Sequence, residues 1–107
     1  LTPWEKIERR LDYAAQADLS IVIYNPRSHG RPDNLKKACD ILLKTLPENR
    51  PCGVVRNIGR EGQQKFLLTL KELRDFEADM FCTVFVGNAQ TKIIGENLVT
   101  PRGYRDV

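Results

Sequence analysis

Short, almost wholly apolar, β-branched segments alternate along this chain with longer segments of helical periodicity, and this alternation constrains the fold most strongly. Residues 19–24, 52–56 and 80–86 have the composition of strands that are covered on both faces. The connections between them are long enough for crossovers between parallel strands. The pattern therefore predicts an α/β protein, a three-layer α/β/α sandwich whose later strands make the sheet mixed.

Two helices are expected beside these strands. The first follows Thr2 and Pro3, which suit a cap and the first helical position. The second begins near Asp33 or Asn34, where a capping side chain is available, and is stopped by Pro47. Three- and four-residue spacing gives each helix an apolar face, formed by Trp4, Ile7, Leu11, Ala14 and Ala15 in the first and by Leu35, Ala38, Cys39, Leu42 and Leu46 in the second.

The segment 63–73 fits two kinds of secondary structure. Phe66 and Leu68 alternate with other residues as in a strand, but the same segment also has apolar residues at helical spacing. We prefer the strand. The tail, residues 91–107, is predicted to form a short ribbon that turns near residues 95–97.

Composition excludes several classes of function. The net charge of +3 is mild, and the basic residues are not clustered with aromatic residues as in nucleic-acid-binding proteins. No apolar run approaches the roughly 18 residues of a membrane span. Cys39, Cys52 and Cys82 lie in apolar segments without CxxC spacing, which is typical of buried cytosolic thiols. We therefore expect a cytoplasmic protein without a metal site, a nucleic-acid partner or membrane association.

The length of 107 residues suffices for one domain with one core but is small for an enzyme with two substrates. The chain begins at Leu1 instead of Met and enters helical periodicity at once. We therefore expect a segment of a longer polypeptide.

Three polar loops follow the predicted strands. They comprise residues 24–28, 56–63 and 87–91, and they are rich in asparagine, glycine and arginine. If the strands are parallel neighbours, these loops meet at the carboxyl edge of the sheet, where ligands of α/β proteins bind. The alternative is that asparagine and glycine only form turns there.

Six arginines lie in or beside the predicted loops, and a subset could converge on an acidic ligand because guanidinium groups match carboxylates. The alternative is a set of solvent-exposed arginines without a shared target. The six arginines are Arg27, Arg31, Arg56, Arg60, Arg102 and Arg105.

The sequence shows no nucleophile paired with a base and no glycine-rich nucleotide motif, so the catalytic residues stay unknown.

Four motifs follow one another along the chain: residues 23–28 (IYNPRS), 54–63 (VVRNIGREGQ), 84–91 (VFVGNAQT) and 99–104 (VTPRGY). In this order they resemble the precorrin-3B C17-methyltransferases of the tetrapyrrole methylase family. The resemblance implies methylation of C17 of precorrin-3B, or of its cobalt counterpart, with ring contraction in cobalamin biosynthesis. S-adenosylmethionine is the implied methyl donor.

The resemblance also implies the place of this chain within a larger enzyme. Family members have two α/β lobes with the donor between them, and residues 1–107 resemble the C-terminal lobe alone, without its N-terminal lobe. We expect a homodimer of the whole protein and an inactive isolated lobe. The implied donor contacts are Tyr24, Asn25, Pro26, Asn57, Gly59, Gly62, Thr100 and Pro101, and the arginines expected to bind the carboxylates of the tetrapyrrole are Arg27, Arg56, Arg60 and Arg102.

Two other functions remain open. The arginine loops alone fit a non-catalytic module that binds an acidic metabolite. A structural dimerisation domain is supported by family analogy alone.

Overall fold

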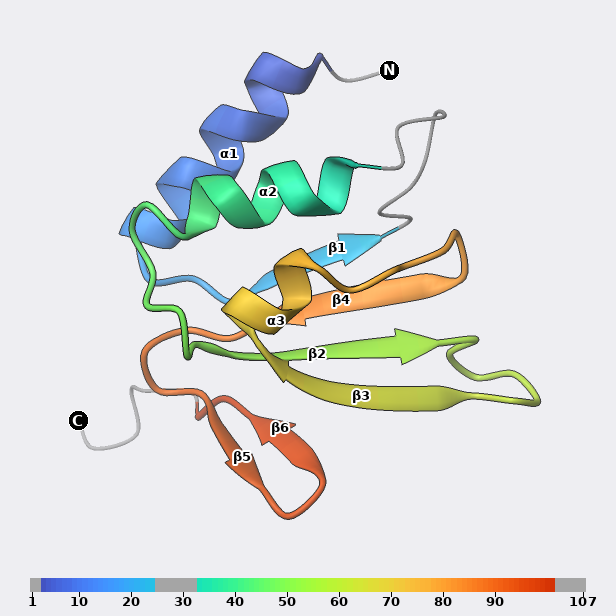
Figure 1. The fold of residues 1–107 in the computed structure, drawn as a ribbon. Helices are drawn as coiled ribbons and strands as arrows, with labels where there is room; N and C mark the ends of the chain where they lie inside the picture. The colour runs from blue at the N-terminus through green and yellow to red at the C-terminus, as the bar shows by residue number, and fades with distance from the viewer. Residues whose placement is uncertain (1–2, 25–32, 102–107) are drawn as a thin grey trace.

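A computed structural model describes residues 3–24 and 33–101 of the chain. Within these residues, three helices cover one face of a four-stranded sheet, and a two-stranded hairpin lies toward its other face (Figure 1). The helices are α1 (Trp4–Gln16), α2 (Asn34–Leu42) and α3 (Leu70–Arg74). The strands are β1 (Ile21–Tyr24), β2 (Pro51–Arg56), β3 (Gln64–Thr69) and β4 (Cys82–Val86), and the hairpin consists of β5 (Lys92–Ile94) and β6 (Asn97–Val99).

Both predicted helices are present, with some differences at their ends. Pro3 is the N-cap of α1, and the predicted cap Thr2 lies outside the described residues. Asp33 is the N-cap of α2 but makes no side-chain capping bond. The helix α2 ends at Leu42 instead of continuing to Pro47, although Leu46 is still buried, in the turn that follows.

The α/β class is confirmed, but the prediction of a mixed sheet is wrong. The strand order is β1-β4-β2-β3, and every neighbouring pair is antiparallel. Because β1 and β2 are both antiparallel to β4, they run in the same direction, as the crossover through α2 predicts. However, β4 lies between them. A crossover fixes the direction of two strands but does not make them neighbours.

One face of this sheet forms the core with the helices. Side chains alternate between the faces of a strand, so Val54 and Val84 point toward the helices and are fully buried, whereas Val22 and Tyr24 lie on the other face and are exposed. On that other face, a Cβ added at Gly53 would lie 3.6 Å from the Leu98 side chain of β6. The predicted second layer of helices is thus replaced by the hairpin in the described part of the chain.

The ambiguous segment contains both kinds of structure. The strand β3 ends at Thr69, whose side chain accepts a hydrogen bond from the Glu72 amide at 3.2 Å while the Glu72 carboxylate accepts one from the Thr69 amide at 2.8 Å. This capping box starts α3 and places Leu70 and Leu73 in the core. The predicted ribbon in the tail is confirmed as β5 and β6, which turn at Gly95 with a φ of 62°.

Candidate functional site

The antiparallel sheet separates the three polar loops into two groups. Tyr24 and Arg56 end β1 and β2 at the edge where Cys82 begins β4, and we call this edge the Arg56 rim. Val86 ends β4 at the opposite edge, beside Pro51, and we call that edge the Gly87 rim because Gly87 follows. The length of β2 separates the rims by about 17 Å. The expectation that all three loops meet at one edge is therefore wrong.

The predicted site residues divide accordingly. Tyr24, Arg56, Asn57, Gly59, Arg60 and Gly62 lie at or beside the Arg56 rim. The Thr100 hydroxyl is hydrogen bonded to that of Thr91, in the loop at the Gly87 rim, and Pro101 follows it. Hence the two groups of predicted donor contacts do not form one pocket in this lobe. Asn25, Pro26, Arg27 and Arg102 lie outside the described residues.

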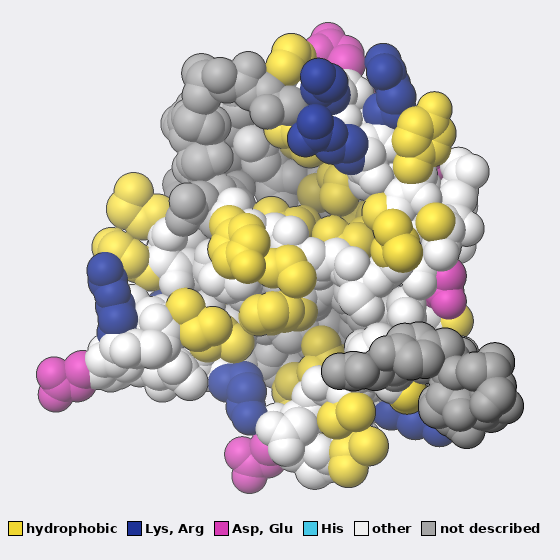
Figure 2. All heavy atoms as spheres, turned by 180° about the vertical axis from the view of Figure 1, so that it is seen from behind, with side chains coloured by type: hydrophobic (Ala, Val, Ile, Leu, Met, Phe, Trp, Pro, Cys, Tyr) yellow, Lys and Arg dark blue, Asp and Glu magenta, His cyan; other side chains and the backbone are white. Residues whose placement is uncertain are grey.

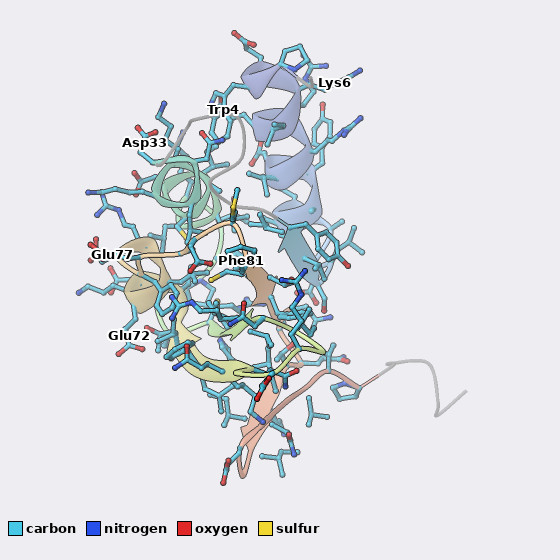
Figure 3. All side chains as sticks on the ribbon, turned by 90° about the vertical axis from the view of Figure 1, so that its right-hand side faces the viewer. Trp4, Lys6, Asp33, Glu72, Glu77 and Phe81 are labelled. Carbon is cyan, nitrogen blue, oxygen red and sulfur yellow. The ribbon has the colours of Figure 1, made fainter. Side chains whose placement is uncertain are left out.

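A hollow of about 190 Å³ opens at the Arg56 rim. Figure 3 views the molecule from this side, with Phe81 near the centre. Three large apolar side chains are exposed there, Ile58 by 55%, Met80 by 62% and Phe81 by 51%. The residues that line the hollow are Asn57, Ile58, Arg60, Met80, Phe81, Cys82 and Thr83.

The loop 57–63 has a defined conformation. Asn57, Gly59 and Gly62 have φ values of 56°, 73° and 82°, in the left-handed region that glycine adopts readily. The Gly59 amide donates to the Gln63 side chain at 2.8 Å, and the Asn57 side-chain amide donates to the Gly62 carbonyl at 3.5 Å. The two glycines therefore serve the shape of the loop, as the sequence suggested, and Asn57 supports it from within.

The two arginines of the rim have different surroundings. The Arg56 guanidinium donates to the Gln64 side chain at 3.1 Å and to the Glu77 carbonyl at 3.4 Å. Its Nε lies 3.2 Å from the Asp79 carboxylate, which makes an ion pair, but the geometry is not that of a hydrogen bond. The exposed Arg60 guanidinium lies over the Phe81 ring, 5.7 Å from its centroid. Protein groups thus engage Arg56, whereas Arg60 faces the hollow.

Asp79 organises the chain that leads into β4. Partial desolvation raises the pKa of this carboxyl, but hydrogen bonds from the Phe81 amide and the Cys82 thiol, together with the charge of Arg56, outweigh it. The pKa of Asp79 is therefore below its ordinary value, and the carboxylate is the form that these donors stabilise.

The Gly87 rim contains a network of internal hydrogen bonds. The Thr91 side chain is buried and accepts from the Asn88 amide at 2.8 Å. Arg50, also buried, donates to the Gly87 carbonyl at 3.5 Å and lies 3.6 Å from the Asp18 carboxylate. Protein groups satisfy these side chains, so this loop is an architectural element.

The described residues contain neither a metal-binding cluster nor a membrane-spanning helix. Residues 3–24 and 33–101 contain no group of three or more histidine, cysteine, aspartate or glutamate side chains that could hold a metal ion. None of the helices in this part of the chain has the length and apolarity needed to cross a membrane.

The fold and the hollow are those of an α/β protein with an open depression at one end of its sheet. The chain is 45% identical over 105 residues to a probable cobalt-factor III C(17)-methyltransferase of Salmonella typhimurium. The matched region covers 97% of this chain and 43% of the relative. It is 37% identical over 109 residues to a precorrin-3B C(17)-methyltransferase of a Sinorhizobium species, with coverages of 97% and 43%. No protein-family model matches the chain.

A solved structure gives the same result for the fold. The crystal structure of the methyltransferase CobJ superposes with a TM-score of 0.83 at 34% identity, over 94% of this chain and 42% of that one. Nearly the whole chain is therefore similar to part of these C17-methyltransferases, and it spans less than half of their length.

The sequence reasoning missed Met80 and Phe81 as candidate site residues because it assigned them to a buried strand. The strand starts at Cys82, and both side chains are exposed beside the hollow. Asp79, just before them, is a residue typical of turns, and its carboxylate accepts a hydrogen bond from the Phe81 amide. It could have indicated that the strand begins only after Phe81.

Proposed function

We propose that this chain is the C-terminal lobe of an S-adenosylmethionine-dependent methyltransferase that acts on C17 of precorrin-3B or cobalt-factor III, with ring contraction, in cobalamin biosynthesis. The observation that carries the proposal is the match of nearly the whole chain to part of several C17-methyltransferases. The hollow at the Arg56 rim supports it, because the strands of two of the four motifs, β1 and β2, end there.

The methyl donor is proposed to bind at the Arg56 rim. Exposed Ile58, Met80 and Phe81 offer apolar surface to its flat, apolar part, and the loop from Asn57 to Gly62 offers backbone polar groups. The volume of about 190 Å³ is below the roughly 300 Å³ at which small-molecule sites begin. This lobe thus supplies one wall of the site, and a second lobe supplies the rest.

The proposed donor contacts are those of the Arg56 rim: Tyr24, Asn57, Gly59 and Gly62, with Asn25 and Pro26 in the adjoining segment outside the described residues. Thr100 and Pro101 are left out because Thr100 pairs with Thr91 at the other rim. The sulfonium of the donor supplies a methyl group that is already activated. The residues of this lobe hold the donor and keep water from the reacting atoms.

The acidic tetrapyrrole is proposed to meet Arg60. This guanidinium is exposed beside the hollow and lies over the Phe81 ring, 5.7 Å from its centroid, and its planar group of donors suits a carboxylate. Arg27 and Arg102 remain proposed substrate contacts outside the described residues.

The position of α1 agrees with a preceding lobe. This helix begins toward the same side of the molecule as the Arg56 rim (Figure 1), and Lys37, near the start of α2, lies 5.9 Å from the centroid of the Trp4 ring. We propose that a lobe joined before Trp4 lies on this side of the molecule.

We also propose that the whole protein is a cytoplasmic homodimer. Figure 2 shows several hydrophobic side chains at the surface of the face seen from behind. Val22 of β1 and Ile93 and Ile94 of β5 are 44%, 47% and 58% exposed. Apolar surface of this kind is typical of an interface between proteins.

Calorimetry of the full-length polypeptide with S-adenosylhomocysteine tests the proposed function. Phe81→Ala removes apolar surface from the hollow, so we expect roughly tenfold weaker binding. Tyr13→Ala is the matched control, because this aromatic residue of α1 is 62% exposed and does not line the hollow. It should bind like the unchanged protein. Absence of binding by the unchanged full-length protein would refute the proposal.

Methyl transfer distinguishes the enzyme from a module that only binds acidic metabolites. The full-length protein should transfer a labelled methyl group to a tetrapyrrole substrate. Binding of the tetrapyrrole without binding of the donor would support the module instead.

A further inference from the structure

We infer that Arg56 and Asp79 form a positioning pair that holds the Phe81 side of the hollow and, through Phe81, orients Arg60. The inference rests on the proposed donor site at the Arg56 rim. It gives Arg56 a role different from the substrate contact expected from the sequence.

Asp79 shapes the turn that enters β4. One of its carboxylate oxygens accepts from the Phe81 amide at 2.9 Å and from the Cys82 thiol at 3.3 Å. The Asp79 carbonyl accepts from the Cys82 amide at 3.2 Å. Asp79 therefore accepts two hydrogen bonds from the backbone of Phe81 and Cys82 and a third from the Cys82 side chain, and both residues line the hollow.

Arg56 anchors this turn to the sheet. Its Nε lies 3.2 Å from the second Asp79 oxygen, and the Glu77 carbonyl, earlier in the same segment, accepts from its guanidinium at 3.4 Å. The guanidinium also lies over the Phe66 ring of β3 at 5.5 Å. The Arg56 side chain is 26% exposed and is held between the turn and the neighbouring strand β3.

The turn is coupled to the proposed ligand contacts on the other side. The Asn57 amide donates to the Phe81 carbonyl at 3.0 Å, which joins the glycine-containing loop to the turn. The Phe81 ring in turn carries the Arg60 guanidinium at 5.7 Å. A continuous series of contacts therefore leads from Arg56 through Asp79 and Phe81 to Arg60.

Stability alone does not account for this arrangement. Ion pairs between partly exposed side chains contribute little to the free energy of unfolding. A second pair, between Arg74 of α3 and Asp40 of α2, joins two helices. The pairs are alike in kind, but Asp79 is hydrogen bonded to two residues that line the hollow, whereas Arg74 is bonded to Asp40 and Asp75, which do not line it. Arg74→Gln is therefore a matched control.

The test is a double-mutant cycle in the full-length polypeptide, with affinity for S-adenosylhomocysteine as the readout. Arg56→Gln and Asp79→Ala should each weaken binding about tenfold, because both release the same turn. The affinity of the double variant should equal, within about twofold, the affinity of the single variant that binds less tightly. Arg74→Gln should leave the affinity unchanged, and the melting temperature of each variant is recorded beside it.

The other outcomes overturn the inference. Unchanged affinity in Arg56→Gln and Asp79→Ala, or additive losses, would show that the pair does not position the site. If Arg56→Gln alone raises the KM for the tetrapyrrole and Asp79→Ala leaves it unchanged, Arg56 binds substrate directly. Failure of the unchanged protein to bind S-adenosylhomocysteine would instead refute the proposed function.

Discussion

The hydroxyl oxygens of Thr91 and Thr100 lie 2.6 Å apart and close the base of the hairpin formed by β5 and β6. The same Thr91 oxygen accepts from the Asn88 amide at 2.8 Å. With 5% exposure, Thr91 makes these bonds away from bulk water. The sequence motif that contains Thr91 thus holds the hairpin to the sheet.

Thr91→Val tests this role. Valine keeps the shape but leaves the Asn88 amide and the Thr100 hydroxyl without this partner, which costs about 1–3 kcal/mol. Urea unfolding measures the free energy. Thr45→Val, at an exposed turn, is the control and should change it by less than about 0.5 kcal/mol. Equal effects at both positions would contradict the assigned role.

Gly87→Ala is expected to destabilise the lobe. A Cβ at Gly87 would lie 2.5 Å from the Cβ and Cγ2 of Thr91, so the loop must shift, at a cost of about 1–3 kcal/mol. Gly53→Ala is the comparison, because its Cβ would meet its nearest neighbour at 3.6 Å, an ordinary contact. Thermal unfolding measures the effect, and the Tm should be clearly lower for Gly87→Ala but not for Gly53→Ala. A stable Gly87→Ala protein would show that the loop adapts freely.

Thr69→Ala should weaken the start of α3. The substitution removes the acceptor of the Glu72 amide and half of the capping box, and the loss of such a cap costs about 1 kcal/mol. Chemical denaturation is the measurement. Lys71→Ala, exposed on the same helix, should have a smaller effect. A larger loss from Lys71→Ala would argue against the cap.

Burial raises the pKa of Cys39 and Cys52 to about 12 each, from an ordinary value of 9.0. The folded state therefore favours the neutral thiols. The contribution of these thiols to stability is constant below about pH 9 and falls as the pH rises toward 12, because the unfolded chain ionises first. Each thiol contributes a slope of about 1.4 kcal/mol per pH unit.

Unfolding experiments from about pH 8 to pH 11 measure this slope. Cys39→Ala should reduce the decline, because one of the two thiols no longer titrates. A decline as steep as in the unchanged protein would assign the pH dependence to other groups.

The segment 63–73 was ambiguous in the sequence because it contains the end of a strand and the start of a helix. Its first half forms β3 and its second half forms α3, so each interpretation was correct for one half. The boundary is set by Thr69 and Glu72, three residues apart in a capping box. That spacing was present in the sequence and could have been used.

The arrangement of the strands could not be predicted in the same way. Local patterns identified β1, β2 and β4, and the crossover through α2 correctly gave β1 and β2 one direction. The insertion of β4 between them depends on pairing between residues that are far apart in the sequence. For this reason, the loop after Val86 was predicted at the wrong rim.

The candidate site was predictable in part. The glycines of the loop 57–63 indicated an unusual backbone, and the structure describes left-handed residues there. The engagement of Arg56 by Asp79 was not visible, because partners of a long side chain depend on tertiary packing. Exposed Phe81 was likewise hidden by its apolar character.

The central place of β4 also affects how the lobe is made. β1 lies at one end of the strand order with β4 as its neighbour, although some sixty residues separate the two strands in the chain. During translation, at about 5–20 residues per second, β1 leaves the ribosome several seconds before β4 exists. Until then its backbone has no strand to pair with, so assembly of this sheet waits for the last third of the segment to be synthesised.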